Sequence, residues 1–237
     1  MTTRTTVGLA AVALLTATML GGCSDDDGGG DKAFADQSYD EIKSAALDAM
    51  ASLEAVHAEL SVEADGQSVA SDVRMSTDGN CSGTVTLGEA SAELLRVDGE
   101  GWYKPNRELL EQILPGRSAA ATEFVGDSWV VDSEDVQTGS NCDLEAFVDS
   151  LSDDEEEADT EVVGVEELDG QDVVKLAYTN PQGDGTAYVL VEGEHYLVKI
   201  ELSGDMPAVV EFSEFDEEVD TEAPAEDETV DLAEFRP

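Results

Sequence analysis

Residues 56–87, VHAELSVEADGQSVASDVRMSTDGNCSGTVTL, contain the pattern that decides the fold class. Apolar and polar residues alternate in three consecutive stretches, which is the period of half-buried β-strands. Asp65-Gly66 and Asp78-Gly79 separate these stretches, and Asp-Gly pairs favour the two-residue turns of β-hairpins. Links this short cannot cross over a sheet, so the strands are predicted to pair in antiparallel fashion.

The same alternation continues beyond this stretch. Residues 92–97 form a fourth expected strand, and Asp98-Gly99 turns the chain back into Gly101–Tyr103. Further strands, separated by turns that contain glycine, are expected over residues 161–167, 172–179, 185–192, 196–203 and 208–215. The chain is therefore predicted to contain two runs of antiparallel strands.

Helical periodicity appears before the first strand and between the two runs. Ser38 and Glu41 form a capping box, and apolar residues then recur at helical spacing, which predicts an amphipathic helix over residues 39–55. The middle of the chain is expected to hold a brief strand over residues 129–131 and short helices over residues 107–114, 119–126 and 143–151. This order of elements indicates the α+β class.

Alternating strands present one apolar face, which must be covered by other elements. The helices could fill that face and leave a packed core, or they could leave a cavity beneath them. The residues that would line such a cavity, and that would be core residues if it is filled, are Leu60, Val62, Val73, Met75, Val85, Leu87, Val189, Leu197 and Ile200.

The first 22 residues are predicted to be a lipoprotein signal peptide. The apolar run from Val7 to Leu20 is about 21 Å long as a helix, shorter than a hydrocarbon core of about 30 Å. A short apolar run followed by small residues is typical of a secretory signal. Its end, Leu20-Gly21-Gly22-Cys23, resembles the lipobox of bacterial lipoproteins. That resemblance implies cleavage before Cys23 and attachment of a diacylglyceryl group to its thiol. The alternative is an ordinary signal peptide in which the cysteine occurs by chance.

The charge of the chain is strongly negative. Asp and Glu total 56 and Lys and Arg total 11, which gives a net charge of −45, so nucleic-acid binding is excluded. Apolar residues make up 41% of the sequence, enough to build a core. One domain is expected over residues 38–215, between an acidic Gly/Asp tether at residues 23–37 and an acidic tail at residues 216–237. The acids indicate a solvated surface that favours a monomer, and the alternatives are diffuse binding of divalent cations or a docking face for a basic partner.

Cys81 and Cys142 remain if Cys23 carries lipid, and outside the cytoplasm they are predicted to form a disulfide. The loop of 61 residues that they close corresponds to about 4 kcal/mol in the chain-entropy description. A metal pair or redox couple is the competing interpretation. The sequence has no CxxC motif, and His57 and His195 lie in no ligand spacing, so neither a metal site nor a cofactor is expected.

The motifs of the common enzyme classes do not point to catalysis. Gly126-Asp127-Ser128 matches the GDS stretch of one esterase class, but the Asp-x-x-His that such enzymes need downstream is missing before His195. Carboxylate pairs are too abundant here for any one of them to indicate a catalytic site. No catalytic residue is therefore assigned, and the chain is expected to be a binding protein and not an enzyme.

Several sequence segments together resemble those of one protein family. The lipobox, the leading helix, the run of strands, Val97-Asp98-Gly99, Trp102-Tyr103-Lys104-Pro105 and Leu168-Asp169-Gly170-Gln171 are similar to the actinobacterial lipoproteins of the LppX/LprG group, which share the fold of the LolA lipoprotein carrier. The resemblance implies a strongly curved antiparallel half-barrel with helices on its concave face. It also implies an apolar cavity for acyl chains and lipid carriage at the extracytoplasmic face of the cell membrane. A surface-tethered structural or interaction domain with a filled core, or an envelope-sensing domain, is the alternative.

Overall fold

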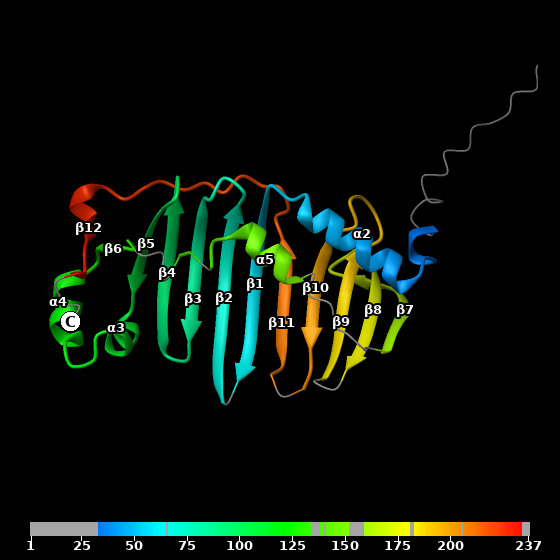
Figure 1. Ribbon diagram of the computed structural model, residues 1–237, viewed down its shortest axis with the longest axis horizontal. Helices are drawn as coiled ribbons and strands as arrows, with labels where there is room; N and C mark the ends of the chain where they lie inside the picture. Colours follow the sequence, from blue (N-terminus) through cyan, green and yellow to red (C-terminus); the bar gives the residue numbers. More distant parts are fainter. Residues whose placement is uncertain are drawn as a thin grey trace, which may run out of the picture.

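The computed structural model describes residues 33–64, 66–133, 138–139, 141–151, 159–180, 183–204 and 206–233. These residues form one large, open, curved sheet of twelve strands, and the helices over residues 39–51, 107–113, 118–125 and 144–151 lie on one face of it (Figure 1). All pairs of neighbouring strands are antiparallel except the short pair β12 and β6. The predicted α+β class, with two runs of antiparallel strands, is confirmed.

The N-terminal half of the fold is a helix followed by a run of five strands. Its elements are α2 (Tyr39–Ala51), β1 (Ala55–Ala64), β2 (Gln67–Ser76), β3 (Cys81–Leu87), β4 (Ala90–Val97) and β5 (Glu100–Pro105). Asp98 and Gly99 both have positive φ, 51° and 84°, as a type I′ hairpin turn requires. The expected Asp-Gly turn between β4 and β5 is therefore present.

The remaining elements form the helical middle section and a second run of strands. They are α3 (Arg107–Ile113), α4 (Ser118–Val125), β6 (Trp129–Val131), α5 (Leu144–Leu151), β7 (Asp159–Leu168), β8 (Gln171–Asn180), β9 (Gly183–Leu190), β10 (Leu197–Leu202), β11 (Ala208–Ser213), a 3₁₀ turn (Glu226–Glu228) and β12 (Thr229–Val230). Asp169 and Gly170 have φ of 51° and 84°, so the turn between β7 and β8 is of the same type as the turn between β4 and β5.

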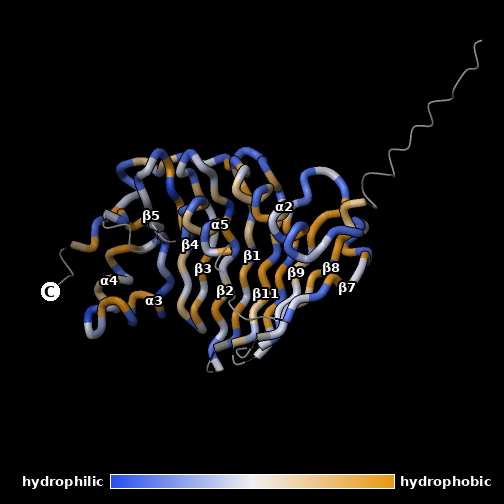
Figure 2. The backbone as a smooth tube through the Cα atoms, turned by 45° about the vertical axis from the view of Figure 1, so that its right-hand side comes forward, coloured by the Kyte–Doolittle hydropathy of each residue, from blue (hydrophilic) through white to orange (hydrophobic). Residues whose placement is uncertain are grey.

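The two runs of strands join through their inner members. The strand order is β12-β6-β5-β4-β3-β2-β1-β11-β10-β9-β8-β7, so β1 pairs with β11 in the middle of the sheet. The backbone in Figure 2 is apolar along much of the strands and hydrophilic at many of the turns that link them. Alternation directs the apolar side chains of the strands to the concave face, where they form two core clusters with the helices.

Helices α2 and α5 cover the centre of the concave face. Ile42 and Met50 of α2 and Leu144 of α5 are buried against Val73 of β2 and Phe212 of β11. Burial of an aliphatic or aromatic side chain stabilises the folded state by about 1.5–3 kcal/mol. This cluster is therefore the main core of the fold.

Helices α3 and α4 cover the β4–β6 end of the same face. Leu110 of α3 and Val125 of α4 are buried against Leu94, Tyr103 and Val130 of the sheet. The small side chain of Ala121, which is fully buried, lets α4 approach this cluster closely. At this end of the sheet the helices fill the concave face.

The folded part begins before residue 38, where the sequence placed its start. Phe34 is 4% exposed, and its ring stacks on that of His195 with 3.6 Å between the centroids. Helix α2 ends at Ala51 instead of residue 55, because Ser52 caps it and the apolar pattern continues in a different conformation. Leu53 lies in the loop after the helix and Val56 lies in β1, and both side chains are buried. Their helical spacing in the sequence therefore reflects burial in the core and not a continuation of the helix.

Residues 216–233 also differ from the expected acidic tail. Asp216 accepts hydrogen bonds from the Glu54 amide (2.7 Å) and from the Tyr196 hydroxyl (2.8 Å). The chain then crosses the strand ends to the far end of the sheet (Figure 1), where β12 pairs with β6. Val219 and Leu232 are buried. The sequence does not predict this, because acidic residues dominate the composition of the segment.

The predicted signal peptide, Cys23 and the first part of the tether lie outside the described residues. None of the helices in the described part of the chain is long and apolar enough to cross a membrane. The lipid anchor at Cys23 is therefore taken up below as a proposal.

Candidate functional site

A cleft of about 580 Å³ opens on the concave face between helices α2 and α5 and strands β7–β11. Small-molecule sites occupy about 300–1,000 Å³, so the cleft has the size of such a site. It lies at the opposite end of the sheet from α3 and α4, where α2 runs across the strands (Figure 1). At this end the helices cover the concave face only in part, and the space beneath them is the cleft.

The walls of the cleft are mostly apolar. The floor consists of inward-facing strand residues, which are Leu176, Ala187, Val189, Leu197, Ile200, Leu202 and Val210. Helix α2 contributes Ala46 and Leu47, and α5 contributes Leu151; we call these two helices the roof of the cleft. Strand alternation explains the floor, because successive side chains of β8–β11 point to opposite faces.

Polar side chains lie at the margin of the cleft. The first two turns of α2 place Tyr39, Asp40 and Lys43 there. Ser38 fixes where this helix begins, since its hydroxyl donates to the Glu41 carboxylate (2.6 Å) and its amide donates to the same group (3.0 Å). Hydrogen bonds from Ser38 also lower the pKa of Glu41. The helix start, and with it the position of Lys43, is thus set by the capping box.

Tyr178 of β8 owes its place in the wall to a glycine on the neighbouring strand. It pairs with Gly185 of β9, and a Cβ atom at Gly185 would overlap the Tyr178 ring. The ring therefore lies over the backbone of β9 and lines the cleft. A side chain at position 185 would push the ring out of this position.

The disulfide between Cys81 and Cys142 fastens α5 to the sheet. Cys81 begins β3 and is fully buried, and Cys142 directly precedes Asp143, whose carboxylate accepts a hydrogen bond from the Ala146 amide (2.9 Å) at the start of α5. Val148 packs into the core one turn further on. The predicted bond is present, and it fixes the N-terminal end of α5. The C-terminal end of the same helix places Leu151 in the cleft.

No protein-family model matches the sequence, and no curated protein is significantly similar to it. Solved structures are more informative. LprF from Mycobacterium bovis aligns with 78% of this chain and 96% of its own, at a TM-score of 0.54 and 16% identity. The chain has the fold of LprF. The predicted curved antiparallel sheet with helices on its concave face is thereby confirmed.

Two further structures align over similar lengths. Lipoprotein LppX from Mycobacterium tuberculosis has a TM-score of 0.42 at 16% identity and covers 78% of this chain and 100% of its own. A LolA superfamily protein from Nitrosomonas europaea has a TM-score of 0.27 at 10% identity, with coverage of 76% and 93%. At these identities the comparisons concern the fold, and the LprF alignment is the one on which the assignment rests.

In the LprF-like fold the nine expected cavity residues separate into groups. Val189, Leu197 and Ile200 line the cleft. Val73 and Met75 are buried in the main core, and Val85 packs between the two core clusters. Of the others, Leu60 and Val62 of β1 are half-buried, and Leu87 at the end of β3 is exposed.

The sequence missed other cleft residues. Leu176 and Val210 lie in predicted strands and share the inward face, so alternation alone could have identified them. Leu47 and Lys43 could not be identified in this way, because only the position of α2 over β7–β10 brings them to the cleft. The cleft is therefore a property of how the helices dock, which the strand pattern does not contain.

Proposed function

We propose that this chain is a membrane-anchored extracytoplasmic lipoprotein that binds an amphiphile in the cleft under α2 and α5. The observation that carries the proposal is the cleft itself, which is apolar, has a volume of about 580 Å³ and opens beside polar side chains. The resemblance to LppX/LprG lipoproteins supports the same function. Carriage without chemistry fits walls made mainly of aliphatic side chains.

The apolar floor would hold an acyl chain by the hydrophobic effect. Each methylene group that leaves water contributes about 0.8 kcal/mol, so a chain of about ten groups can offset the entropic cost of association. Leu176, Ile200 and Val210 are half-buried or buried strand residues with no charge nearby in the floor. The aliphatic floor residues offer no hydrogen-bonding side chain, so selectivity would come from the polar side chains of the lining, which are the hydroxyl groups of Ser150, Thr160 and Tyr178 and the margin on α2.

Lys43 is the feature of the margin that would select the headgroup. The whole chain has only 11 Lys and Arg against 56 acids, whereas the two charged residues that line the cleft, Asp40 and Lys43, balance each other, so the margin lacks the negative excess of the rest of the chain. A carboxylate or phosphate on the ligand would sit beside its ammonium group, while Tyr39 would offer a hydroxyl. We propose an anionic amphiphile.

The anchor would keep the cleft close to the membrane. Only nine residues separate Cys23 from the first described residue, Ala33, and they span at most about 30 Å when fully extended. Phe34 fixes the following segment to the sheet through its stack on His195. Lipid leaving the membrane would thus reach the Tyr39–Lys43 margin over a short path.

The test of the function is native mass spectrometry of the full chain isolated from its producing cells, with extraction of any co-purified lipid. Stoichiometric lipid, together with displacement by a fluorescent fatty acid, would support carriage. A chain that is free of lipid and does not bind the fluorescent fatty acid would instead be a tethered interaction or envelope-sensing domain.

Replacing Lys43 by Gln is expected to weaken binding of the fluorescent fatty acid by about tenfold, which corresponds to about 1.4 kcal/mol of charge interaction at a partly screened site. Binding of an uncharged acyl ester should change little, since its contacts are with the floor. Arg107→Gln is the matched control: it removes the same charge from a helix, α3, that does not line the cleft. Equal losses for both ligands would contradict the assigned role.

Replacing Cys23 by Ala is expected to abolish labelling by a metabolic fatty-acid probe and to leave the precursor uncleaved. The thiol is the lipid acceptor in the lipobox, and cleavage follows lipid attachment. Gel mobility and probe fluorescence measure both effects. Ser24→Ala, one residue further on, should be labelled and cleaved normally. Persistent labelling of Cys23→Ala would show that the anchor lies elsewhere.

A further inference from the structure

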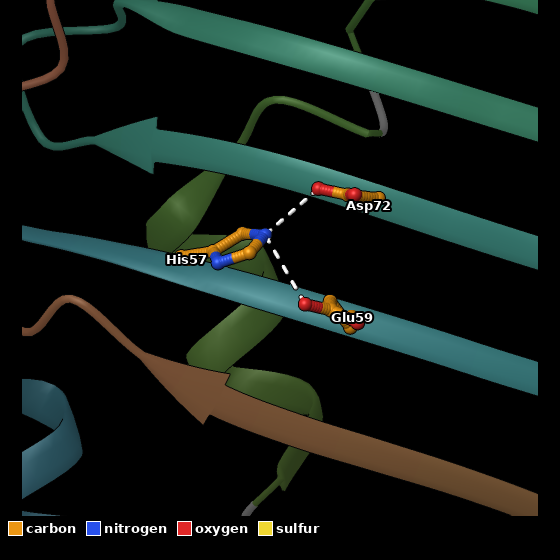
Figure 3. Close-up of side chains that lie close together, drawn as sticks. All are labelled: His57, Glu59 and Asp72. Carbon is orange, nitrogen blue, oxygen red and sulfur yellow. Dashed lines mark hydrogen bonds and ion pairs between the residues drawn. The ribbon is translucent and has the colours of Figure 1, made fainter.

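A second cluster lies on the face of the sheet opposite α5. His57 and Glu59 of β1 and Asp72 of β2 converge there (Figure 3). The His57 Nε2 atom is 2.7 Å from Asp72 Oδ1 and 3.8 Å from Glu59 Oε1, and one ligand atom from each residue lies within 4.8 Å of the others. The sequence predicts no metal site here, because the spacing of the three residues along the chain fits no ligand motif.

Strand alternation and register bring these residues together. His57 and Glu59 are two positions apart on β1 and therefore point to the same face, away from Val56 and Ala58 in the core. Asp72 stands directly opposite Glu59 in the β1–β2 pairing. The cluster is thus a fixed product of the sheet, independent of any loop.

The arrangement places negative charges where they repel each other. Glu59 pairs with Asp72 on one side and with Glu211 of β11 on the other, so three carboxylates form one row across the sheet. Like charges directly opposite each other destabilise a strand pair. Lys199 approaches Glu211 at 3.2 Å and Arg74 approaches Asp72 at 3.9 Å, so each end of the row has a cation nearby, while Glu59 in the middle has the His57 ring at 3.8 Å. A positive centre between Glu59 and Asp72 would remove this repulsion.

The ring of His57 is oriented for such a role. It is 6% exposed, and its Nδ1 atom lies 3.1 Å from the Ser213 hydroxyl. A proton on Nδ1 directed at Ser213 leaves the lone pair of Nε2 facing the two carboxylates. At 2.7 Å, Nε2 and Asp72 Oδ1 form a hydrogen bond, which a cation bound to both atoms would replace. On the other side of the ring, Glu214 lies 3.9 Å from Nδ1 and accepts a hydrogen bond from Arg74 (2.8 Å), so this carboxylate is already paired.

We propose that His57, Glu59 and Asp72 bind a divalent transition-metal ion of the Zn²⁺ type, with one imidazole nitrogen and two carboxylate oxygens as ligands. Bonds from Zn²⁺ to such atoms are about 2.0–2.2 Å, which separates tetrahedral ligands by about 3.3 Å. The observed separations bracket that value, and the exposed carboxylates of Glu59 and Asp72 are free to rotate towards it. A mixed nitrogen and oxygen set favours Zn²⁺ over Ca²⁺ or Mg²⁺.

The remaining coordination position would face solvent. A shallow hollow of about 380 Å³ on this face is lined by Glu59, Asp72 and Glu211, with Thr84 on the far side. Water in the hollow can complete the coordination, and the ion can enter and leave through it. The site is therefore open and exchangeable, in contrast to the closed coordination of a structural zinc.

The full chain, freed of metal by chelator and dialysed, is titrated with Zn²⁺ in a large excess of Mg²⁺, which saturates diffuse binding to the acidic surface. One tight site is expected by calorimetry. His57→Gln and Asp72→Asn should each weaken it at least about tenfold. In nitrogen NMR, the Nε2 resonance of His57 should shift on Zn²⁺ addition while that of His195 does not.

Glu93→Gln is the matched control, since it removes one carboxylate from the same face of β4 without touching the cluster. It should leave the tight site unchanged. Circular dichroism of each variant separates loss of a ligand from loss of the fold, and Asp72, whose side chain is exposed, tolerates Asn even if His57 does not tolerate Gln. Absence of a tight site in the parent chain, or equal weakening by Glu93→Gln, would overturn the proposal.

Discussion

Replacing Val73 by Trp is expected to destabilise the fold by more than about 3 kcal/mol, whereas Ile200→Trp is expected to leave stability nearly unchanged and to abolish lipid binding. Val73 is 1% exposed in the main core, and Gly83 on the next strand packs against it so closely that a Cβ there would overlap it. Ile200 is half-buried in the floor of the cleft, where an indole can occupy space that the ligand would fill. Urea unfolding and fluorescent fatty-acid displacement measure the two effects.

Val163→Trp controls for the addition of an indole to a strand. Val163 lies on the outermost strand β7 and is 53% exposed, so Trp there should affect neither stability nor binding. The proposal of a ligand cleft fails if Ile200→Trp destabilises the chain as much as Val73→Trp does and the parent chain binds no lipid. That combination would mean that the helices fill the whole concave face.

Removing the disulfide is expected to cost about 4 kcal/mol of unfolding free energy in the chain-entropy description. Cys81 and Cys142 are 61 positions apart and both are buried, so the double variant Cys81→Ala/Cys142→Ala frees a long loop in the unfolded chain. Fatty-acid binding should weaken as well, because α5, whose C-terminal end places Leu151 in the cleft, loses its attachment to the sheet at the other end. Urea unfolding of the parent and the double variant gives the difference.

Reductant provides the internal control for this experiment. The parent chain in dithiothreitol should unfold at the urea concentration of the double variant, apart from the small loss from removing two sulfur atoms. The double variant itself should not respond to dithiothreitol. An oxidised parent with two titratable thiols, or a parent insensitive to reductant, would contradict a stabilising role for the bond.

The local elements could be predicted because their signals are local. The Asp98-Gly99 and Asp169-Gly170 turns have the backbone angles that this pair of residues favours, and they set the hairpins on either side. The start of α2 follows from the Ser38 capping box. The end of α2 was misplaced because Leu53 and Val56 are buried by tertiary packing, and burial produces the same apolar spacing in a loop as in a helix.

The pairing of β1 with β11 could not be predicted in the same way. His57 and Ser213, which face each other in that pairing, are 156 positions apart, and nothing in the alternation of either strand specifies the other. The cleft depends on this pairing and on the docking of α2, so its floor was predicted only in part. The cluster at His57 depends on cross-strand register, which is equally hidden in a single sequence.

The bond that fastens α5 also sets an order of events. Disulfides form in oxidising compartments and not in the cytoplasm, where the chain is made. A newly synthesised chain therefore has both cysteines reduced, and the helix beside the cleft has no covalent attachment to β3. For an exported protein, the binding site would be completed only after the membrane has been crossed. An exported chain would therefore leave the cytoplasm with no ligand in its cleft and would bind its first ligand outside the membrane.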